Sequence, residues 1–330
     1  MGVLVDSFGR VATDLRVSLT DRCNLRCSYC MPPEGLEWLP APEMLTDEEV
    51  VRLVSVAVAE GVTEVRFTGG EPLLRRGLVS IVSQVAALSP RPHTSLTTNG
   101  IGLARTAADL KAAGLDRVNV SLDTLDRERF KTIARRDRLA DVLAGLAAAA
   151  DAGLVPVKVN AVLLRGANDD EAAPLLRWAL GEGYHLRFIE QMPLDAQHGW
   201  DRATMVTAEE TLARLTAEFD LTPVGAAERG SAPAEEWVVD GGPGRVGVIA
   251  SVTRPFCGAC DRVRLTADGQ LRNCLFAREE SDLRTALRAG ASDEDLAVRM
   301  RAALASKLPG HGIDDPGFLQ PSRPMSAIGG

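Results

Sequence analysis

The sequence lacks the features that direct a chain into a membrane, across one, or onto nucleic acid. Its first residues contain no basic stretch followed by an apolar core, so a signal peptide is not expected. No apolar run is long enough to span a bilayer. Positive charge is in deficit, because 37 Lys and Arg stand against 45 Asp and Glu, a formal net charge of -8. Such a chain does not coat polyanions non-specifically. We therefore expect a soluble, cytoplasmic protein with neither a nucleic-acid nor a membrane partner.

Cysteine is scarce, and every cysteine belongs to one of two groups of three. The first triad lies in the stretch CNLRCSYC, the second in CGAC and LRNCLF: Cys23, Cys27 and Cys30, and Cys257, Cys260 and Cys274. Disulfides are rare in the cytoplasm, so this clustering predicts metal binding. Zinc and iron–sulfur clusters both usually take four protein ligands. Each triad is therefore one ligand short.

The first part of the chain alternates short apolar strands with longer amphipathic or Ala-rich helical segments. The expected strands are 15–19, 64–69, 93–99, 117–123, 157–164 and 186–192. Repeated strand–helix units predict parallel strands joined by crossover helices. About six units, rather than the eight of a closed barrel, favour an α/β fold with a partial, open β/α barrel.

The second part is expected to be a smaller α+β region that carries the second triad. Helices are expected at 207–219 and 292–307, and antiparallel strands at 237–240, 245–251 and 262–276. The segment 226–236 reads as a mobile loop, and we assign it no role. We place the domain boundary between residues 1–225, the barrel, and 226–330, the region of the second triad and a Pro- and Gly-rich tail.

Polar stretches follow most of the expected strands, at the edge where a parallel barrel builds its active site. After the first triad, they are TGGEP (68–72), TTNG (97–100), SLDT (121–124) and EQMP (190–193). The glycines in TGGEP let the backbone approach a ligand closely. Taken alone, each stretch also fits an ordinary turn.

Five cations are expected on strands whose side chains face one cavity. Arg262 and Arg264 alternate on one expected strand, so their side chains point to the same face. Arg16, Arg66 and Lys158 lie on strands expected to be buried, where an unpaired cation is costly. In a chain of net charge -8, this concentration suggests a polyphosphate substrate. A solvated strand face is the alternative for the arginine pair alone.

A C-x3-C-x2-C stretch directly after the first strand of a β/α barrel resembles the radical S-adenosylmethionine (radical SAM) superfamily. There, three thiolates bind three irons of a [4Fe-4S] cluster, and SAM binds the fourth iron through its amino and carboxylate groups. The resemblance implies that the first triad holds this cluster. It also implies that SAM contacts Tyr29, Gly69, Gly70, Glu71, Asn99, Ser121 and Met192.

Longer stretches narrow the resemblance. FCGACDRVRLTADGQLRNCLF, KVNAVLLRGAND, RFIEQMP and the C-terminal Gly329–Gly330 pair are similar to the GTP 3′,8-cyclases of molybdenum cofactor biosynthesis (the MoaA family), over essentially the whole chain. The resemblance implies a second [4Fe-4S] cluster on the second triad, with its open iron facing guanine, and a tail near the active site. It implies GTP binding by Arg16, Arg66, Thr97, Lys158, Arg262 and Arg264, with Arg16, Arg262 and Arg264 as catalytic residues.

The implied reaction is a radical cyclisation, the first step of molybdopterin biosynthesis. Reduction of SAM gives methionine and a 5′-deoxyadenosyl radical, which abstracts the 3′ hydrogen of GTP. C3′ then bonds to C8 of guanine. The family further implies a reductant protein of the flavodoxin or ferredoxin type, a downstream cyclic pyranopterin synthase, and a homodimer.

Two alternatives stay open at this point. Another radical SAM enzyme with an auxiliary cluster, such as a peptide-modifying one, usually carries more C-terminal cysteines than these three. A non-enzymatic binding protein with two zinc sites needs a fourth ligand at each site, and His311 is a candidate at the second triad.

Overall fold

The computed structural model describes residues 2–329. Within this range, no helix is both long and apolar enough to span a bilayer. Gly330, one half of the C-terminal glycine pair, lies outside the described residues.

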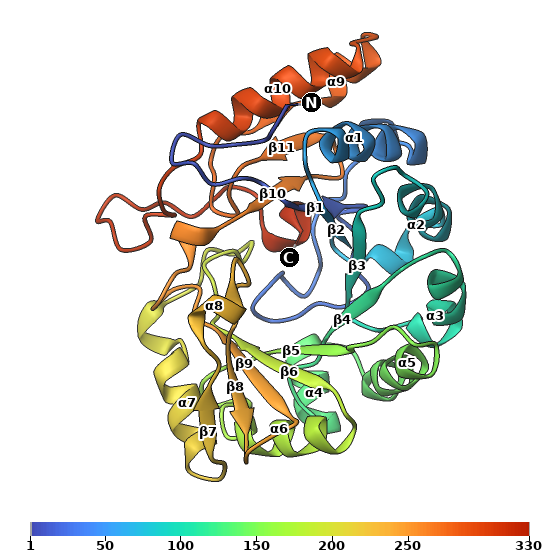
Figure 1. Cartoon of the computed structure of the whole chain (residues 1–330). Coiled ribbons are helices and arrows are strands. Elements are labelled where there is room, and N and C mark those ends of the chain that lie inside the picture. The colour runs from blue at the N-terminus through green and yellow to red at the C-terminus, as the bar shows by residue number, and fades with distance from the viewer. Residues whose placement is uncertain (1, 330) are drawn as a thin grey trace.

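Six parallel strands form the wall of an open barrel, in the order of the sequence (Figure 1). They are β1 (Asp14–Ser18), β2 (Glu64–Thr68), β3 (His93–Thr98), β4 (Arg117–Ser121), β5 (Lys158–Val162) and β6 (His185–Ile189). Each pairs in parallel with the next. The connecting helices lie outside this wall: α1 (Asp47–Ala59), α2 (Leu78–Ala86), α3 (Leu103–Ala112), α4 (Arg127–Ala134), α5 (Leu139–Asp151) and α6 (Ala172–Gly181). The arrangement confirms the α/β class and the partial β/α barrel.

Two more parallel strands extend the wall at its two edges. β9 (Arg245–Ile249) pairs in parallel with β6, and β10 (Arg262–Leu265) pairs in parallel with β1. The expectation of purely antiparallel strands was wrong here, because each of these strands has a barrel neighbour as well as a hairpin neighbour. On the hairpin side, β8 (Glu235–Val239) is antiparallel to β9, and β11 (Gln270–Arg272) is antiparallel to β10, as expected.

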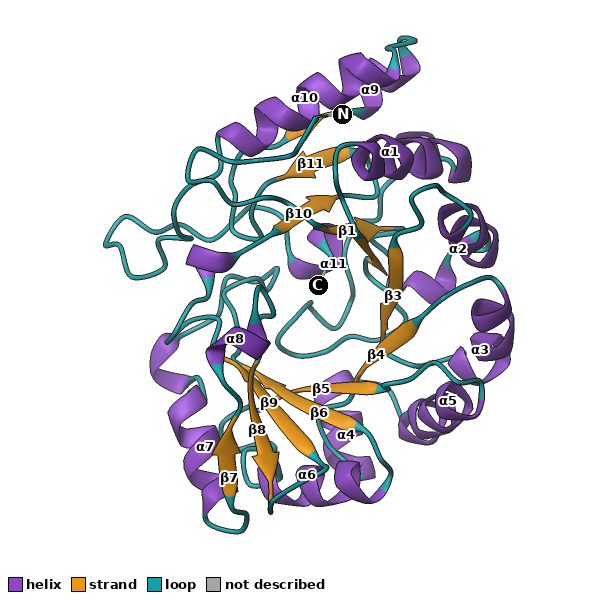
Figure 2. Cartoon of the chain, in the orientation of Figure 1, coloured by secondary structure: helices purple, strands orange, loops and turns teal. Residues whose placement is uncertain are grey.

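In the described residues, the strands form one sheet of 12, with β7 (Leu221–Pro223) at one end and β12 (Ser281–Asp282) at the other. Figure 2 shows the strands arranged around the centre of the molecule, with most helices outside them and α11 (Met325–Ile328) near the centre. The sheet runs through both parts of the chain, and the division at residue 225 stays a prediction.

The second half contributes helices that begin at sequence signals. Thr207 begins α7 (Ala208–Thr216) and Ser292 begins α10 (Asp293–Ala305), each with a capping box. α9 (Arg284–Arg288) precedes α10. The expectation of an irregular loop at 226–236 was wrong in part, because α8 (Ala226–Arg229) and the first residues of β8 lie there.

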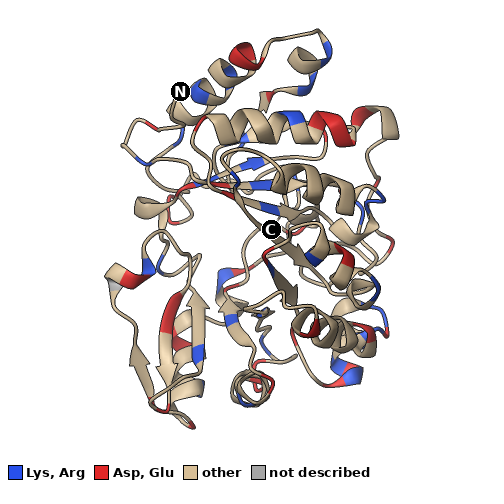
Figure 3. Cartoon of the chain, turned by 45° about the vertical axis from the view of Figure 1, so that its right-hand side comes forward, with Lys and Arg blue, Asp and Glu red and all other residues tan. Residues whose placement is uncertain are grey.

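The barrel strands alternate between apolar residues that point outward and polar residues that point inward. On β1, Leu15 and Val17 are buried in the main core, whereas Arg16 lies on the opposite face. The register places Arg16 beside Arg66 of β2 and Arg264 of β10. Figure 3 shows Lys and Arg positions on the strands as well as on the outer helices. The fold thus brings the strand cations into the barrel interior.

Candidate active site

One cavity of about 330 Å³ opens at the C-terminal ends of the barrel strands. Its wall includes all six cysteines, and all six are free thiols. The other predicted site residues that line it are Arg16, Tyr29, Arg66, Gly69, Gly70, Thr97, Asn99, Ser121, Met192, Arg262 and Arg264. The fold therefore brings together two triads from opposite ends of the sequence.

The first triad lies on the loop that follows β1. The Ser28 N–H donates to Ile133 O at 2.9 Å, which holds this loop against the end of α4. Burial raises the pKa of the thiols of Cys27 and Cys30, that of Cys30 to about 12. A thiolate here needs a cation to stabilise it, and an iron–sulfur cluster supplies one.

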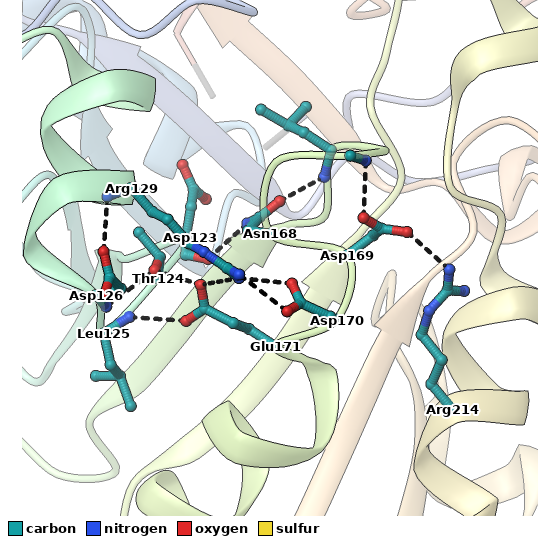
Figure 4. Close-up of polar contacts among 12 residues, drawn as sticks. Asp123, Thr124, Leu125, Asp126, Arg129, Asn168, Asp169, Asp170, Glu171 and Arg214 are labelled. Atoms are coloured by element: carbon teal, nitrogen blue, oxygen red, sulfur yellow. Dashed lines mark hydrogen bonds and ion pairs between the residues drawn. The ribbon is translucent and has the colours of Figure 1, made fainter.

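Tyr29, the aromatic residue inside the first triad, is fixed by a hydrogen bond. Its hydroxyl donates to Asp123 Oδ2 at 2.8 Å, and Asp123 Oδ1 accepts from the Val162 N–H at 2.9 Å. Figure 4 shows the support behind Asp123, where Asn168 Nδ2 donates to its carbonyl oxygen at 2.6 Å. Burial raises the pKa of Asp123 to about 6. The Tyr29 ring is thereby held at the cavity wall.

Part of the stretch KVNAVLLRGAND lines the cavity, and the residues at its end support the loops around the cavity. Asn160 and Val162 line the cavity. The residues just beyond it join neighbouring loops, since Glu171 accepts from Thr124 Oγ1 at 2.6 Å and Asp170 pairs with Arg129 at 2.5 Å (Figure 4). These contacts fix the loops after β4 and β5 relative to each other.

The TGGEP stretch approaches the first-triad loop closely. The Gly70 N–H donates to Thr20 O at 2.7 Å, and a Cβ on Gly70 would lie 2.3 Å from Arg22 O. Gly69 has a φ of +139°, and a Cβ there would lie 2.4 Å from Thr20 O. Only glycine fits at either position, so this part of the wall is backbone.

Glu71 lies behind the cavity wall rather than in it. Its buried carboxylate accepts from the N–H groups of Leu73 and Asn99, at 3.0 and 2.7 Å. It also accepts from Thr98 Oγ1 at 2.6 Å. Burial raises its pKa to about 7. Asn99 Nδ2 in turn lies 3.8 Å from Cys23 Sγ. Glu71 therefore ties the ends of β2 and β3 to the first triad, and its contact with SAM stays a prediction.

The second triad lies on η4 (Cys257–Ala259), at the residue after it and beyond β11. His311, the candidate zinc ligand, has both ring nitrogens occupied. Nε2 donates to Ser251 O and Nδ1 accepts from the Ile313 N–H, each at 3.1 Å. These contacts hold the His311 ring against the backbone beside the second triad, and its role as a zinc ligand stays a prediction.

In residues 2–329, no three His, Cys, Asp or Glu side chains converge as one ion requires. A [4Fe-4S] cluster is less demanding, because each thiolate binds a different iron. Two groups of three free thiols around one cavity fit two such clusters.

Four arginines, here called the arginine cluster, lie around the Asp14 carboxylate inside the barrel. They are Arg16, Arg66, Arg262 and Arg264. Asp14 Oδ2 lies 3.8 Å from both Arg16 Nε and Arg66 Nη2, and 3.5 Å from Arg262 Nε. Arg262 Nη2 also lies 3.8 Å from Asp261 Oδ1. Two carboxylates cannot neutralise four guanidiniums, so the cluster carries net positive charge.

The arginine cluster has unused hydrogen-bonding capacity as well as charge. Within the described chain, the Nε atoms of Arg16, Arg66 and Arg262 are buried without a hydrogen-bond partner. Burial lowers the pKa of Arg16, and repulsion from Arg66 and Arg264 lowers it further. Burial likewise lowers the pKa of Arg264 to about 10. A polyanion is the ligand that satisfies both the charge and the free donors.

Sequence reasoning missed Arg187 of β6, which also lines the cavity. Its Nη2 donates to Asn119 Oδ1 at 2.9 Å and its Nε to Asn160 Oδ1 at 3.0 Å. Burial lowers its pKa to about 9. The signal was present, because Arg187 interrupts a strand that was expected to be buried, as Arg66 does.

Lys158, predicted to bind GTP, is not part of the described cavity wall. It lies two residues before Asn160 on β5 and therefore on the same face, further from the C-terminal strand ends. Burial lowers the pKa of Lys158 to about 8, and the charges of Arg187 and Arg117 add to this.

The C-terminal segment returns to the cavity. Arg264 Nη1 donates to Gly329 O at 2.5 Å, and Ser18 Oγ donates to Ile328 O at 2.8 Å. A Cβ on Gly329 would lie 2.2 Å from Ser18 Oγ, and its φ is +87°. The structure therefore places the first of the two tail glycines beside the arginine cluster, at a position that only glycine fits.

The open barrel, the glycine wall and the three thiols after β1 together define a class, the radical SAM proteins. Residues 17–179 match the radical SAM superfamily, and residues 184–313 match the molybdenum cofactor synthesis C family. The fold is similar to that of Streptococcus suis SuiB, with a TM-score of 0.58 and 13% identity over 92% of this chain and 68% of that one. It is also similar to anSMEcpe with bound AdoMet, with a TM-score of 0.57 and 15% identity over 91% and 82%.

Curated relatives narrow the class to one family. A GTP 3′,8-cyclase of Streptomyces coelicolor is 70% identical over 329 residues, which cover 99% of this chain and 96% of the relative. A GTP 3′,8-cyclase of Mycolicibacterium smegmatis is 61% identical over 334 residues, covering 100% and 92%. The chain belongs to the GTP 3′,8-cyclase family.

Proposed function

We propose that this chain is a radical SAM GTP 3′,8-cyclase, which catalyses the first step of molybdenum cofactor biosynthesis. One observation carries the proposal: both triads and the arginine cluster line a single cavity. The thiols offer ligands for two clusters, and the cations offer a site for a triphosphate. Membership of the family supports the same conclusion.

The cofactors are two [4Fe-4S] clusters and SAM. Each triad holds one cluster and leaves one iron open, for SAM at the first triad and for guanine at the second. When bound, the first cluster and SAM supply the carbon radical that removes the 3′ hydrogen of GTP. Six residues line the SAM site: Tyr29, Gly69, Gly70, Asn99, Ser121 and Met192. Glu71 lies behind this wall and accepts a hydrogen bond from the Asn99 N–H.

The protein's own part is to hold the substrate. The arginine cluster binds the triphosphate through paired N–H groups. Thr97 lies on the same cavity wall and also contacts GTP. Lys158 contacts GTP from a position on β5 further from the C-terminal strand ends. A fixed triphosphate fixes the ribose, so that C3′ and guanine C8 are held between the two triads. The C3′–C8 bond then forms, and one further electron and a proton complete the product. The enclosing wall keeps water away from the radical.

The reaction needs electrons from outside the chain, which a reductant protein of the flavodoxin or ferredoxin type supplies. Arg22 and Arg136 are exposed near the first-triad loop and suit an acidic donor. The family resemblance also supports a downstream cyclic pyranopterin synthase that consumes the product, and a homodimer. The composition of the chain is the basis for a cytoplasmic location, and the change in strand and helix pattern is the basis for the two domains 1–225 and 226–330.

The decisive experiment is made without oxygen, with both clusters reconstituted. Protein, SAM and a strong reductant are mixed with GTP deuterated at C3′. We expect deuterium in 5′-deoxyadenosine together with the cyclised nucleotide. SAM cleavage without deuterium transfer would keep the radical SAM class and contradict GTP as substrate. Absence of SAM cleavage by protein that carries both clusters would contradict both.

An Arg264→Met variant tests the clamp in the same assay. A hydrogen bond from a charged group contributes about 1.5–3 kcal/mol, so cyclisation should slow at least about tenfold. SAM cleavage should continue. Arg299→Met, at an exposed position on α10, is the control and should behave as the unmodified protein. Normal cyclisation by Arg264→Met would contradict its assignment to the substrate.

A further inference from the structure

Lys307 is a buried cation beside the second triad, and sequence reasoning did not single it out. It follows α10 and is 4% exposed. Its Nζ donates to the carbonyl oxygens of Cys260 and Arg262, each at 3.0 Å. The same Nζ lies 3.6 Å from Cys260 Sγ, within hydrogen-bonding distance of the sulfur. Its ammonium group therefore meets both the backbone and the thiol of one cluster ligand.

The two triads differ in the donors that reach their sulfur atoms. Cys260 Sγ is met by two cationic groups, Lys307 Nζ and Arg262 Nη1, the latter at 3.8 Å. In the first triad, Cys23 Sγ accepts from the Leu25 N–H at 3.4 Å and Asn99 Nδ2 at 3.8 Å, which are both neutral. Among residues 2–329, no other thiol of either triad accepts a hydrogen bond from a charged side chain. The positive charge is concentrated at one ligand of the second triad.

Charge at a ligand sulfur changes how readily an iron–sulfur cluster accepts an electron. Reduction adds negative charge that is shared with the sulfurs, and hydrogen bonds to them stabilise the reduced form. A buried cation acts more strongly than an exposed one, because little water screens it. We propose that Lys307 raises the reduction potential of the cluster held by the second triad, so that this cluster is reduced more readily than it would be without the lysine.

This inference rests on the second cluster of the proposed function. It deepens that proposal by giving the second cluster one-electron chemistry of its own, beside its contact with guanine. The plainer interpretation is that Lys307 only ties the end of α10 to the backbone of β10. The two interpretations predict different results, since a backbone tie affects stability and leaves the potential unchanged.

The experiment compares two lysine-to-methionine variants of the full chain. Lys307→Met removes the charge and keeps an unbranched side chain. Lys111→Met is the matched control, because exposed Lys111 also donates to a carbonyl, Gly153 O at 2.8 Å, with no thiol involved. Each reconstituted protein is titrated electrochemically and followed by electron paramagnetic resonance. A chain with alanine at Cys23, Cys27 and Cys30 isolates the signal of the second cluster.

In Lys307→Met, we expect the ratio of reduced to oxidised second cluster, at a fixed potential, to fall by about tenfold, which is 59 mV for a one-electron couple. The first cluster should not change, and neither cluster should change in Lys111→Met. Lys307→Arg should recover most of the shift. An unchanged ratio in Lys307→Met, with or without a lower melting temperature, would overturn the inference and leave Lys307 as a backbone tie.

A second measurement covers the case in which Lys307→Met does not assemble. The unmodified chain is labelled with ¹⁵N in the side chains of its four lysines, and the reduced second cluster is examined by pulsed resonance. A lysine nitrogen coupled to the cluster, which persists in Lys158→Met, is expected; no such coupling would overturn the inference. Iron content separates the two proposals, because a chain that binds only one cluster contradicts the proposed function rather than the role of Lys307.

Discussion

Asp14 and Glu71 are both buried carboxylates, yet their neighbours give them opposite properties. Burial raises the pKa of Asp14, but the charges of Arg66, Arg16 and the rest of the arginine cluster lower it overall. Among the described residues, Glu71 accepts hydrogen bonds from neutral donors, and burial raises its pKa to about 7. Asp14 holds the arginines that would bind a ligand, whereas Glu71 holds backbone N–H groups in place.

Glu71→Gln should destabilise the protein. The substitution replaces one acceptor oxygen by an amide group that faces an N–H donor, either Leu73 or Asn99. A buried polar group without a partner costs about 1–3 kcal/mol. We expect a lower melting temperature and faster iron loss from the first cluster. Glu48→Gln, at an exposed position in the first turn of α1, is the control, and equal stability of the two variants would contradict the role of Glu71.

Lys158 gives the substrate site a pH dependence with a definite sign. Its pKa is lowered to about 8, so the ammonium charge is present at pH 7 and lost as the pH rises toward 9. The KM for GTP should therefore rise by up to about tenfold over this range, the effect of one charged hydrogen bond. Steady-state kinetics at pH 7, 8 and 9 measure it. Lys158→Met should show a high KM at every pH, and a flat profile in the unmodified protein would remove Lys158 from the site.

Residue spacing predicted the two triads and four of the five strand cations because each is a local pattern. Side chains alternate between the two faces of a strand, and this alternation was enough to place Arg16, Arg66 and the Arg262–Arg264 pair at the cavity. The same argument places Arg187 of β6 at the cavity. Lys307 follows an ordinary surface-type helix, and its contact with Cys260 depends on how α10 packs on β10, which no local pattern contains.

At the scale of elements, Arg323 is one of the residues that anchor the C-terminal segment. Arg323 contacts both oxygens of Asp268, at 2.8 and 3.1 Å, in the turn between β10 and β11. Its Nε also lies 2.8 Å from Glu280 Oε1. These contacts precede α11 and the Gly329 position, so they hold the tail against the cavity.

Arg323→Met should release the tail without unfolding the barrel. Three charge-assisted hydrogen bonds are lost, two to Asp268 and one to Glu280, each contributing about 1.5–3 kcal/mol to local stability. Limited proteolysis with mass spectrometry should show earlier cuts in residues 308–329. Burial raises the pKa of Asp268 and its contact with Arg323 lowers it, with a net lowering below 3.8. The anchor should therefore persist at neutral pH and fail only as the pH falls through the lowered pKa. Cuts at the unmodified rate would contradict the anchor.

Helix starts were predictable from the sequence, whereas the parallel partners of β9 and β10 were not. The capping threonine at 207 and serine at 292 act within one turn of the helix, so local reading finds them. The parallel partner of β10 is β1, at the other end of the chain. Local patterning identified β10 as a strand but gave no information about that partner.

At the scale of the whole molecule, the core and the cofactor sites occupy opposite faces of the barrel wall. The main core lies between the outer face of the strands and the helices. Cluster removal by a chelator should therefore leave far-ultraviolet circular dichroism almost unchanged. The melting temperature should fall, and protease sites should open near residues 20–40 and 255–275. Global unfolding on chelation would show that the clusters are needed for the fold itself.

The strand–helix period was enough to predict the barrel, because the signal repeats along the chain. It could not show that β9 and β10 extend the wall at its two edges, or that the second triad would face the first. Both depend on contacts between distant segments, and the resemblance to a family supplied the relation between the triads that periodicity could not.

Repulsion within the arginine cluster lowers the stability of the protein at a site that its activity requires. Arg16, Arg66 and Arg264 stand side by side on neighbouring strands, and their mutual repulsion opposes the folded state whenever no anion is bound. Arg16→Met should therefore raise the melting temperature of the empty protein and abolish GTP turnover. A selection for thermostable variants that measures only the melting temperature would collect substitutions at these positions and enrich inactive proteins. Such a selection must therefore measure GTP turnover as well.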